Sequence, residues 1–230
     1  MKLDRFLAKQ SSMGRNAAHR LIAAQRVRVD GELCVNNQQE VGRFNQIELD
    51  EAVLQQAERC LYLMLNKPVG ILSATTDPEH RTVIDLLDDP DKHSLHIAGR
   101  LDRGTSGLVL LTNDGRWSKR LMEPVERVPK VYLVETAEDI IPEAVAAFAA
   151  GFYFHTEDIT TQPAELQILA PRQARLTLYE GRYHQVKRMF HRVQNRVTAL
   201  HRESIGSLHL PEDLQPGQWR ALTPAEIAAF

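Results

Sequence analysis

The stretch from Gly99 to Gly115, GRLDRGTSGLVLLTNDG, joins a polar loop directly to an apolar strand. The segment GLVLLT is rich in leucine, valine and threonine, which is typical of a strand buried in a sheet. Just before it, Arg100, Asp102 and Arg103 stand among glycines and hydroxyl residues, which is typical of a tight loop. Functional side chains often lie on loops that a rigid sheet holds in place. The stretch therefore predicts an acid, Asp102, fixed at the edge of a sheet.

Strand and helix patterns mix irregularly along the rest of the chain. Runs of β-branched and apolar residues predict strands, and apolar residues at helical spacing predict helices. We expect strands within residues 60–75 (on both sides of a Pro-Gly turn), 130–136, 163–170, 173–181 and 200–210, and helices at the end of 77–87 and over 115–124, 142–151 and 183–195. This order favours an α+β fold with a mixed, largely antiparallel sheet flanked by helices.

The N-terminal residues predict a small unit of two helices and a hairpin. Apolar residues recur at helical spacing over 3–7 and 17–22, and the residues between them, 10–14, have the chemistry of a turn. Apolar and polar residues then alternate around Asp30-Gly31, a dipeptide that favours a β-hairpin. The arginines of this part fall on positions that we expect to face outward.

These patterns suggest a division of the chain into two domains. Residues 1–50 would form the helix–helix–hairpin unit, and residues 60–230 a larger domain that contains the loop of Asp102. Residues 51–59 contain no turn former, so we expect a helical linker there.

Positive charge gathers in two parts of the chain, although the formal net charge is −2. Residues 1–30 hold seven Lys and Arg against two acids, and residues 171–206 hold eight against two. Residues 31–98 hold five against twelve acids. Two basic zones on an acidic body suit local binding of a polyanion such as nucleic acid. Two solvated helix faces are the alternative interpretation.

Several classes of protein are disfavoured by the sequence. No apolar run approaches the roughly 18 residues of a membrane span, and the first ten residues lack the apolar core of a secretory signal. Cys34 and Cys60 form neither a metal-binding pair nor a disulfide framework. No metal-binding or nucleotide-binding motif is present, so we expect no metal and no cofactor. These features predict a cytoplasmic protein without membrane contact.

Asp102 is the acid whose surroundings most favour chemistry. A carboxylate on a glycine-rich loop at a sheet edge suits acid–base or nucleophilic catalysis. The same side chain could instead cap its own loop. Asp114, in the sequence NDG after the strand, is typical of a turn. The residues alone leave both interpretations of Asp102 open.

Four stretches together resemble the pseudouridine synthases, specifically the type that modifies small-subunit ribosomal RNA. They are LNKPVG at 65–70, GRLDRGTSGLVLLTNDG, KVYLV at 130–134 and EGRYHQVKRMF at 180–190. The first 34 residues resemble the α-L RNA-binding domain named after ribosomal protein S-four. They depart from its usual pattern at Gly14, where a serine is common, and at Gln25, where a glycine is common. The resemblance implies a synthase domain with a central cleft.

The resemblance also implies a role for individual residues. The family's catalytic aspartate corresponds to Asp102, which acts either as nucleophile or as base at the ribose. Arg100 would fill the space that the flipped-out uridine leaves, by planar stacking. Tyr132 would lie against the flipped base, and Lys187 would pair with the aspartate. Arg103 has no family role, so a phosphate contact and a surface charge remain equal alternatives.

The implied reaction isomerises a uridine of 16S ribosomal RNA, of the uridine-516 type, to pseudouridine. Ribosomal RNA, within a 30S assembly intermediate, is the expected partner of a monomeric enzyme. The basic residues expected to bind RNA are Arg100, Arg5, Arg15, Arg20, Arg26, Arg28, Arg182, His184 and Arg188.

There are three alternatives to this predicted function. The first is the same chemistry on a uridine of large-subunit (23S) ribosomal RNA. The second is a ribosome-associated RNA-binding protein without catalysis, although Asp102, Tyr132 and Lys187 are all present. The third is a glycosidase or nuclease, which needs a second acid facing the first, and no motif supplies one.

Overall fold

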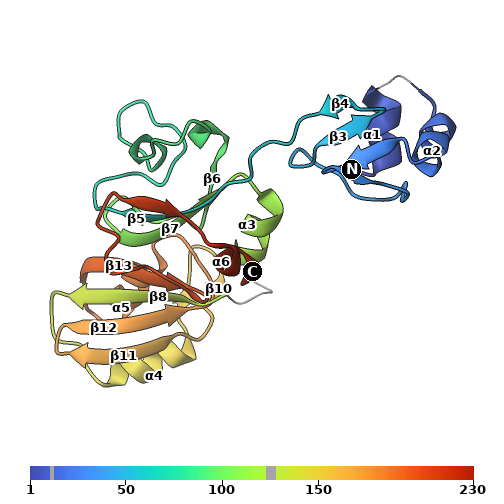
Figure 1. Ribbon diagram of the computed structural model, residues 1–230. Coiled ribbons are helices and arrows are strands. Elements are labelled where there is room, and N and C mark those ends of the chain that lie inside the picture. The colour runs from blue at the N-terminus through green and yellow to red at the C-terminus, as the bar shows by residue number, and fades with distance from the viewer. Residues whose placement is uncertain (11–12, 123–127) are drawn as a thin grey trace. The chain divides into compact units, whose positions relative to one another are not determined.

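The computed structural model describes residues 1–10, 13–122 and 128–230, which form two compact units, Met1–Cys60 and Leu61–Phe230 (Figure 1). Within these ranges no helix is long and apolar enough to cross a membrane. Part of the turn expected at 10–14, and the helix end expected near Pro124, lie outside the described residues.

The first unit packs two helices on a small antiparallel sheet. Its elements are α1 (Leu3–Gln10), α2 (Arg15–Ala23), β1 (Val27–Val29), β2 (Glu32–Leu33), β3 (Ile47–Leu49) and β4 (Ala52–Gln55), with strand order β2-β1-β3-β4. Leu3, Leu7, Ile22 and Ile47 are at most 1% exposed and belong to one core cluster. The expected helices and the hairpin at Asp30-Gly31 are therefore confirmed.

The end of α2 retains a tight turn in spite of the departure from the family pattern at Gln25. The amide of Gln25 donates to the carbonyl of Ile22, and the amide of Arg26 donates to that of Leu21. This is the pairing of a Schellman motif, which places its turn residue in the left-handed region. Gln25 has a φ of 55°, so it adopts the conformation that glycine would take more easily.

The segment 51–59 is not helical, which corrects the expected linker. Asp50 and Glu51 both have positive φ and form a two-residue turn, after which β4 pairs with β3. A turn with two left-handed residues suits the twist of a hairpin, although Asn-Gly is its usual sequence. Pairing with β3 therefore outweighs the helical propensity of this segment.

The second unit is built on a sheet with strand order β11-β12-β8-β13-β7-β5-β15. Its strands are β5 (Tyr62–Lys67), β6 (His96–Ala98), β7 (Ser106–Thr112), β8 (Lys130–Thr136), β11 (Glu165–Ala170), β12 (Gln173–Leu178), β13 (Val197–Ile205), β14 (Leu208–His209) and β15 (Trp219–Ala221). The pairing of β13 with β7 is parallel and the other recorded pairings in this sheet are antiparallel. The mixed, largely antiparallel sheet is confirmed.

Helices complete the second unit. They are α3 (Gly115–Met122), α4 (Glu143–Ala150), α5 (Gln185–Arg192) and α6 (Pro224–Ala228), with 3-10 turns η1 (Ile84–Leu86) and η2 (Lys92–Ser94) and a separate ribbon of β9 (Tyr153–Phe154) and β10 (Ile159–Thr160). In Figure 1 the α4 helix lies beside β11, which it contacts. The helix expected at the end of 77–87 is the single turn η1.

Strands β5 and β7 are buried on both faces of the sheet. Leu65 and Val109 belong to the cluster that includes α4 and α5, whereas Met64 and Leu108 belong to the cluster that includes α3. Side chains alternate between faces along a strand, so a strand with helices on both sides needs a continuous apolar run. This explains the run GLVLLT and holds the residues before it rigidly.

The strand expected after the Pro-Gly turn does not form. Leu72 makes one isolated bridge to Thr82, and the carbonyl of Ile71 accepts a hydrogen bond from Lys67 Nζ at 2.7 Å. Because this segment folds around the Lys67 ammonium, it does not extend along a neighbouring strand.

Candidate active site

Asp102 lies in the loop between β6 and β7, at the edge of the sheet. The amide of Thr105 donates to the carbonyl of Asp102 at 3.0 Å, which closes a turn. The amide of the buried Leu101 donates to Ser73 Oγ at 3.1 Å. The side chain of Asp102 is 29% exposed, so its carboxylate reaches solvent while its backbone is fixed on both sides.

A buried arginine on β13 holds both ends of this loop. Arg202 is 1% exposed, and its Nη2 donates to the carbonyl of Gly99 at 2.7 Å while its Nε donates to that of Leu108 at 2.8 Å. At Gly107, whose φ is 106°, a Cβ would lie 2.3 Å from the Arg202 carbonyl oxygen, so only glycine fits there. Arg202 therefore fixes where the loop leaves and rejoins the sheet.

A buried lysine connects the same loop to the preceding one. Lys67 is fully buried at the end of β5, and its Nζ donates to the carbonyls of Pro68 at 2.9 Å and Ile71 at 2.7 Å. It also reaches the carbonyl of Arg103 at 3.5 Å. Burial lowers the pKa of Lys67 to about 8, while the charge of Asp102 acts in the opposite direction.

Two cationic or protonatable groups face the carboxylate of Asp102. Lys187 Nζ, from the first turn of α5, lies 3.4 Å from Asp102 Oδ2. His184 Nε2, from the residue that precedes the helix, lies 3.5 Å from the same oxygen. The structure thus places Lys187 beside Asp102, as expected. It also places His184 there, a residue that the sequence predicts only as an RNA contact.

The loop before α5 is fixed by a buried acid and a buried amide. Gln185 Nε2 donates to Glu180 Oε1 at 2.7 Å, and the amide of Gln162 donates to the same oxygen at 2.9 Å. Gln185 Oε1 accepts from the amide of Arg182 at 3.0 Å. His184 has a φ of 49°, in the left-handed region, which a residue other than glycine adopts only when its surroundings hold it there.

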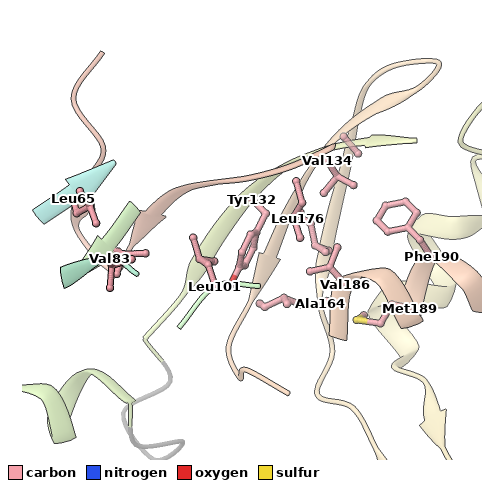
Figure 2. Packing of buried hydrophobic residues seen from close by; sticks show 14 of the residues in the cluster. Leu65, Val83, Leu101, Tyr132, Val134, Ala164, Leu176, Val186, Met189 and Phe190 are labelled. Atoms are coloured by element: carbon pink, nitrogen blue, oxygen red, sulfur yellow. The ribbon is translucent and has the colours of Figure 1, made fainter. Parts of the chain in front are cut away.

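Tyr132 is buried, whereas Arg100 is exposed. Tyr132 is 7% exposed and belongs to the core cluster that contains Leu101 (Figure 2). It is the sheet partner of Leu176 and Arg202, and the Arg202 guanidinium lies 6.0 Å from its ring centre. Arg100 is exposed, and within the described residues its guanidinium has no hydrogen-bond or ion-pair partner.

The basic residues expected to bind RNA differ in how their charge is used. In the second unit, Arg182 Nε donates to Glu180, and both Nη atoms of Arg188 donate to Glu157 at 2.7 Å. Arg103, whose role was open, donates from Nε to the carbonyl of Gly70 at 3.2 Å.

The five arginines of the first unit that are expected to bind RNA are all exposed, as expected. Arg15 binds the buried carboxylate of Asp4, and Arg26 binds Asp50. Arg28 donates to the carbonyl of Gly31 at 2.9 Å. Within the described residues, the side chains of Arg5 and Arg20 make no hydrogen bond or ion pair, so their charge is available to a ligand.

A hollow of about 670 Å³ borders this cluster on the α5 side. His184 and Lys187 belong to its lining, so it opens beside the residues that face Asp102. In the described part of the chain, no three His, Cys, Asp or Glu side chains gather in a way that would hold a metal ion. The groups that the site offers for chemistry are therefore one carboxylate, one ammonium and one imidazole.

This combination of fold and loop matches known proteins. The family model for RNA pseudouridylate synthases matches residues 61–192. A crystal structure of a pseudouridylate synthase superposes with a TM-score of 0.72 at 38% identity, covering 100% of this chain and 99% of the other. The chain therefore belongs to the RNA pseudouridylate synthase family and is an isomerase.

Curated relatives are similar over their whole length. The ribosomal small subunit pseudouridine synthase A of Pseudomonas aeruginosa is 51% identical over 229 residues, covering 100% of both chains. The protein of the same name from Escherichia coli K12 is 45% identical over 229 residues, covering 100% of this chain and 99% of the relative. That from Haemophilus influenzae is 40% identical over 227 residues, covering 99% and 98%.

Replacing Lys67 should give a stability difference that depends on pH. Its folded-state pKa of about 8 lies below the ordinary value of 10.5, so between these values the unfolded chain holds a proton that the folded chain has lost. The unfolding free energy of the parent should therefore rise relative to Lys67→Met as pH increases from 8 to 10.5, and stay at a constant offset below pH 8. Urea unfolding of both proteins across this range measures the difference, and a flat difference would contradict the assigned pKa.

Removing the Lys187 ammonium should impair turnover more than binding. The Lys187 ammonium lies 3.4 Å from Asp102 Oδ2, so its removal takes away a charged partner that holds the carboxylate in one orientation. We expect Lys187→Met to lower kcat by about tenfold or more, which corresponds to ~1.4 kcal/mol in the activation free energy, with KM within a few-fold. Lys187→Arg should retain part of the activity, and Arg196→Met, an exposed charge outside the cluster, should behave as the parent. Equal kcat for Lys187→Met and the parent would exclude the pairing from catalysis.

Proposed function

We propose that this enzyme converts a uridine of 16S ribosomal RNA, of the uridine-516 type, to pseudouridine, with Asp102 as the catalytic carboxylate. The main observation behind this chemistry is that the Asp102 carboxylate lies 3.4 Å from the Lys187 ammonium, which itself lines a hollow large enough for a ligand. Full-length relatives that are named small subunit pseudouridine synthases support the substrate.

The reaction is an isomerisation, so no atom is gained or lost. The bond from the ribose C1′ to uracil N1 breaks, the uracil turns, and a bond from C1′ to C5 replaces it while C5 loses a proton and N1 gains one. Asp102 acts either as the nucleophile at C1′ or as the base that takes a ribose proton. Both routes need the carboxylate of Asp102, and Lys187 and His184 lie close enough to its Oδ2 to hold it in one orientation.

The target base must leave its stack to reach Asp102. Arg100 is exposed and without a partner among the described residues, so its planar guanidinium can occupy the space that the base leaves. Tyr132 is held in the core behind the loop, and we assign its ring to the wall that the flipped base meets. Arg202 and Lys67 hydrogen-bond to the loop of Asp102 and hold it in a fixed position relative to this wall.

We assign the first unit to RNA binding rather than chemistry. Residues 1–50 carry the helix–helix–hairpin that resembles the S-four type domain, and the strand β4 extends its sheet to Gln55. Arg5, Arg20 and Arg28 are exposed arginines that make no ion pair with a carboxylate among the described residues. A phosphate backbone is the ligand that such cations suit.

The proposal includes the setting in which the enzyme acts. We take its partner to be ribosomal RNA within a 30S assembly intermediate, met by a monomer in the cytoplasm. A 23S uridine is the second candidate, because the same catalytic residues would serve it. The full-length similarity to small subunit enzymes favours the 16S target.

Asp102→Asn should abolish turnover while leaving the protein folded. The amide keeps the shape of the side chain but can neither attack C1′ nor accept a ribose proton. Pseudouridine formation should become undetectable, and affinity for 16S ribosomal RNA should stay within about tenfold, or 1.4 kcal/mol. Pseudouridine yield, RNA affinity and melting temperature should be measured on the same preparation.

Asp114→Asn is the matched control for this substitution. Asp114 Oδ1 accepts from the amides of Arg116 at 2.9 Å and Trp117 at 3.3 Å, so it caps the start of α3. This variant should lose some stability, at most about 2 kcal/mol, and keep its activity. Pseudouridine formed by Asp102→Asn at the parent's rate would show that another group is the catalytic acid.

Neutralising the unpaired arginines of the first unit should flatten the salt dependence of RNA binding. Each phosphate contact contributes roughly 0.7–0.9 to the slope of log affinity against log salt. Arg5→Gln, Arg20→Gln and Arg28→Gln should each remove about that amount, whereas Arg26→Gln should remove less because Asp50 already neutralises Arg26. The slope comes from RNA affinities over a series of salt concentrations; slopes equal to that of the parent for all four variants would exclude this surface from RNA binding.

A further inference from the structure

Tyr183 is an aromatic side chain that the fold leaves open to solvent. It is 75% exposed, the largest fraction among the exposed large hydrophobic side chains of the described residues. One face of its ring stacks on the His184 imidazole, with ring centres 3.9 Å apart and planes 18° apart. The other face is therefore free, and it lies parallel to a ring that contacts Asp102.

The loop under this stack is rigid. Glu180 and Gln185 are 8% and 3% exposed and hydrogen-bond to each other, and Gln185 also accepts from the amide of Arg182, the residue before Tyr183. His184 is held in the left-handed region between Tyr183 and the helix. An exposed ring on a fixed loop loses little conformational freedom when a flat ligand stacks on it.

His184 also lines the hollow beside α5, which is basic. The lining consists of Phe154, His155, Thr156, His184, Lys187, Arg188, His191 and Arg192, and it contains no acid. Arg188 is held by Glu157 and lies 3.7 Å over the Phe154 ring, so it forms a fixed wall. Arg192 donates to the carbonyl of Tyr153 at 2.9 Å and is exposed, which leaves its charge free for an anion.

We propose that the free face of Tyr183 receives an unpaired base of the RNA next to the target uridine, and that the hollow behind it holds the attached phosphate. The inference rests on the proposed function, which places the target uridine at Asp102. An aromatic ring stacks on any base, and a basic groove beside it follows the backbone of a single strand. His184 connects the catalytic carboxylate, the exposed ring and the hollow, because it contacts Asp102, stacks on Tyr183 and lines the hollow.

This assignment gives the substrate a defined feature. The RNA must be single-stranded on the side of the target that passes over α5, since a paired base cannot stack on Tyr183. An acidic peptide is the other ligand that a basic hollow could take, but it would have no use for a flat, exposed ring beside it.

The test compares two probes that differ only in their bases. One is a single-stranded oligouridylate, and the other is a ribose-phosphate chain of the same length without bases. Binding of each is measured to full-length Asp102→Asn protein and to the same protein carrying a second substitution, so that turnover does not enter the result.

Loss of the ring should weaken binding to the oligouridylate alone. Tyr183→Ala and Tyr183→Leu should lower its affinity about fivefold or more, which is the lower end of the effect of one base stack. Tyr183→Phe should stay within about twofold. None of the three should alter the affinity of the chain without bases, whereas Arg192→Gln should weaken both probes by a similar factor.

Two results would overturn the proposal. One is an equal effect of Tyr183→Ala on both probes, or no effect on either. The other is displacement of the oligouridylate by polyglutamate at equal charge, which would make the hollow a general anion site. The outcome is independent of catalysis: if the parent formed no pseudouridine in 16S ribosomal RNA while the base-dependent loss remained, the proposed function would fail and the stacking site would stand.

Discussion

The chemistry proposed for this enzyme depends on the contact between Asp102 and the start of α5. The carboxylate comes from the loop before β7, and its partners Lys187 and His184 come from a part of the chain more than eighty residues later. A pair of this kind works only if both segments are fixed, because partly buried charges that lose their partners are costly. Much of the second unit serves this requirement. Arg202 donates to the carbonyl of Gly99 at the start of the loop of Asp102, and Lys67 reaches the carbonyl of Arg103 within that loop. Glu180 accepts a hydrogen bond from Gln185 and so fixes the loop before α5.

Buried cations are an unusual way to hold loops, and their partners explain why they are tolerated. Arg202 and Lys67 donate to backbone carbonyls, and those of Gly99, Pro68 and Ile71 lie in loops outside the strands. The same bonds fix the backbone of glycine-rich segments that have little side-chain packing of their own. Rigidity around Asp102 is thus supplied by the side chains of strands, while Arg100 and the carboxylate of Asp102 in the loop remain accessible to solvent.

Much of the architecture could be predicted from local patterns. The apolar run before Thr112, the amphipathic pattern of α5 and the Asp30-Gly31 hairpin each carry their signal within a few residues. The strand β4 could not be found this way, because its turn uses Asp50 and Glu51 in left-handed conformations that their residue types do not favour. Pairing with β3 decides its structure.

The site residues that lie in a recognisable motif could be predicted, whereas the roles that depend on contacts between distant strands could not. Asp102 and Lys187 follow from sequence stretches, whereas the roles of Arg202 and Lys67 arise from sheet pairings and loop contacts across the unit. Nothing in the sequence around Arg202 or Lys67 indicates the carbonyls that they bind. The contact of His184 with Asp102 depends on its left-handed backbone, which spacing along a helix does not predict.

The central claim is that Asp102 of this chain forms a pseudouridine in small-subunit ribosomal RNA. Its most direct test maps pseudouridines in 16S and 23S ribosomal RNA from cells that lack the gene, with and without the parent gene or its Asp102→Asn variant. The account predicts that one 16S pseudouridine, of the uridine-516 type, is absent without the gene, returns with the parent, and does not return with the variant. A 16S map that is unchanged by loss of the gene, or a loss confined to 23S ribosomal RNA, would contradict it.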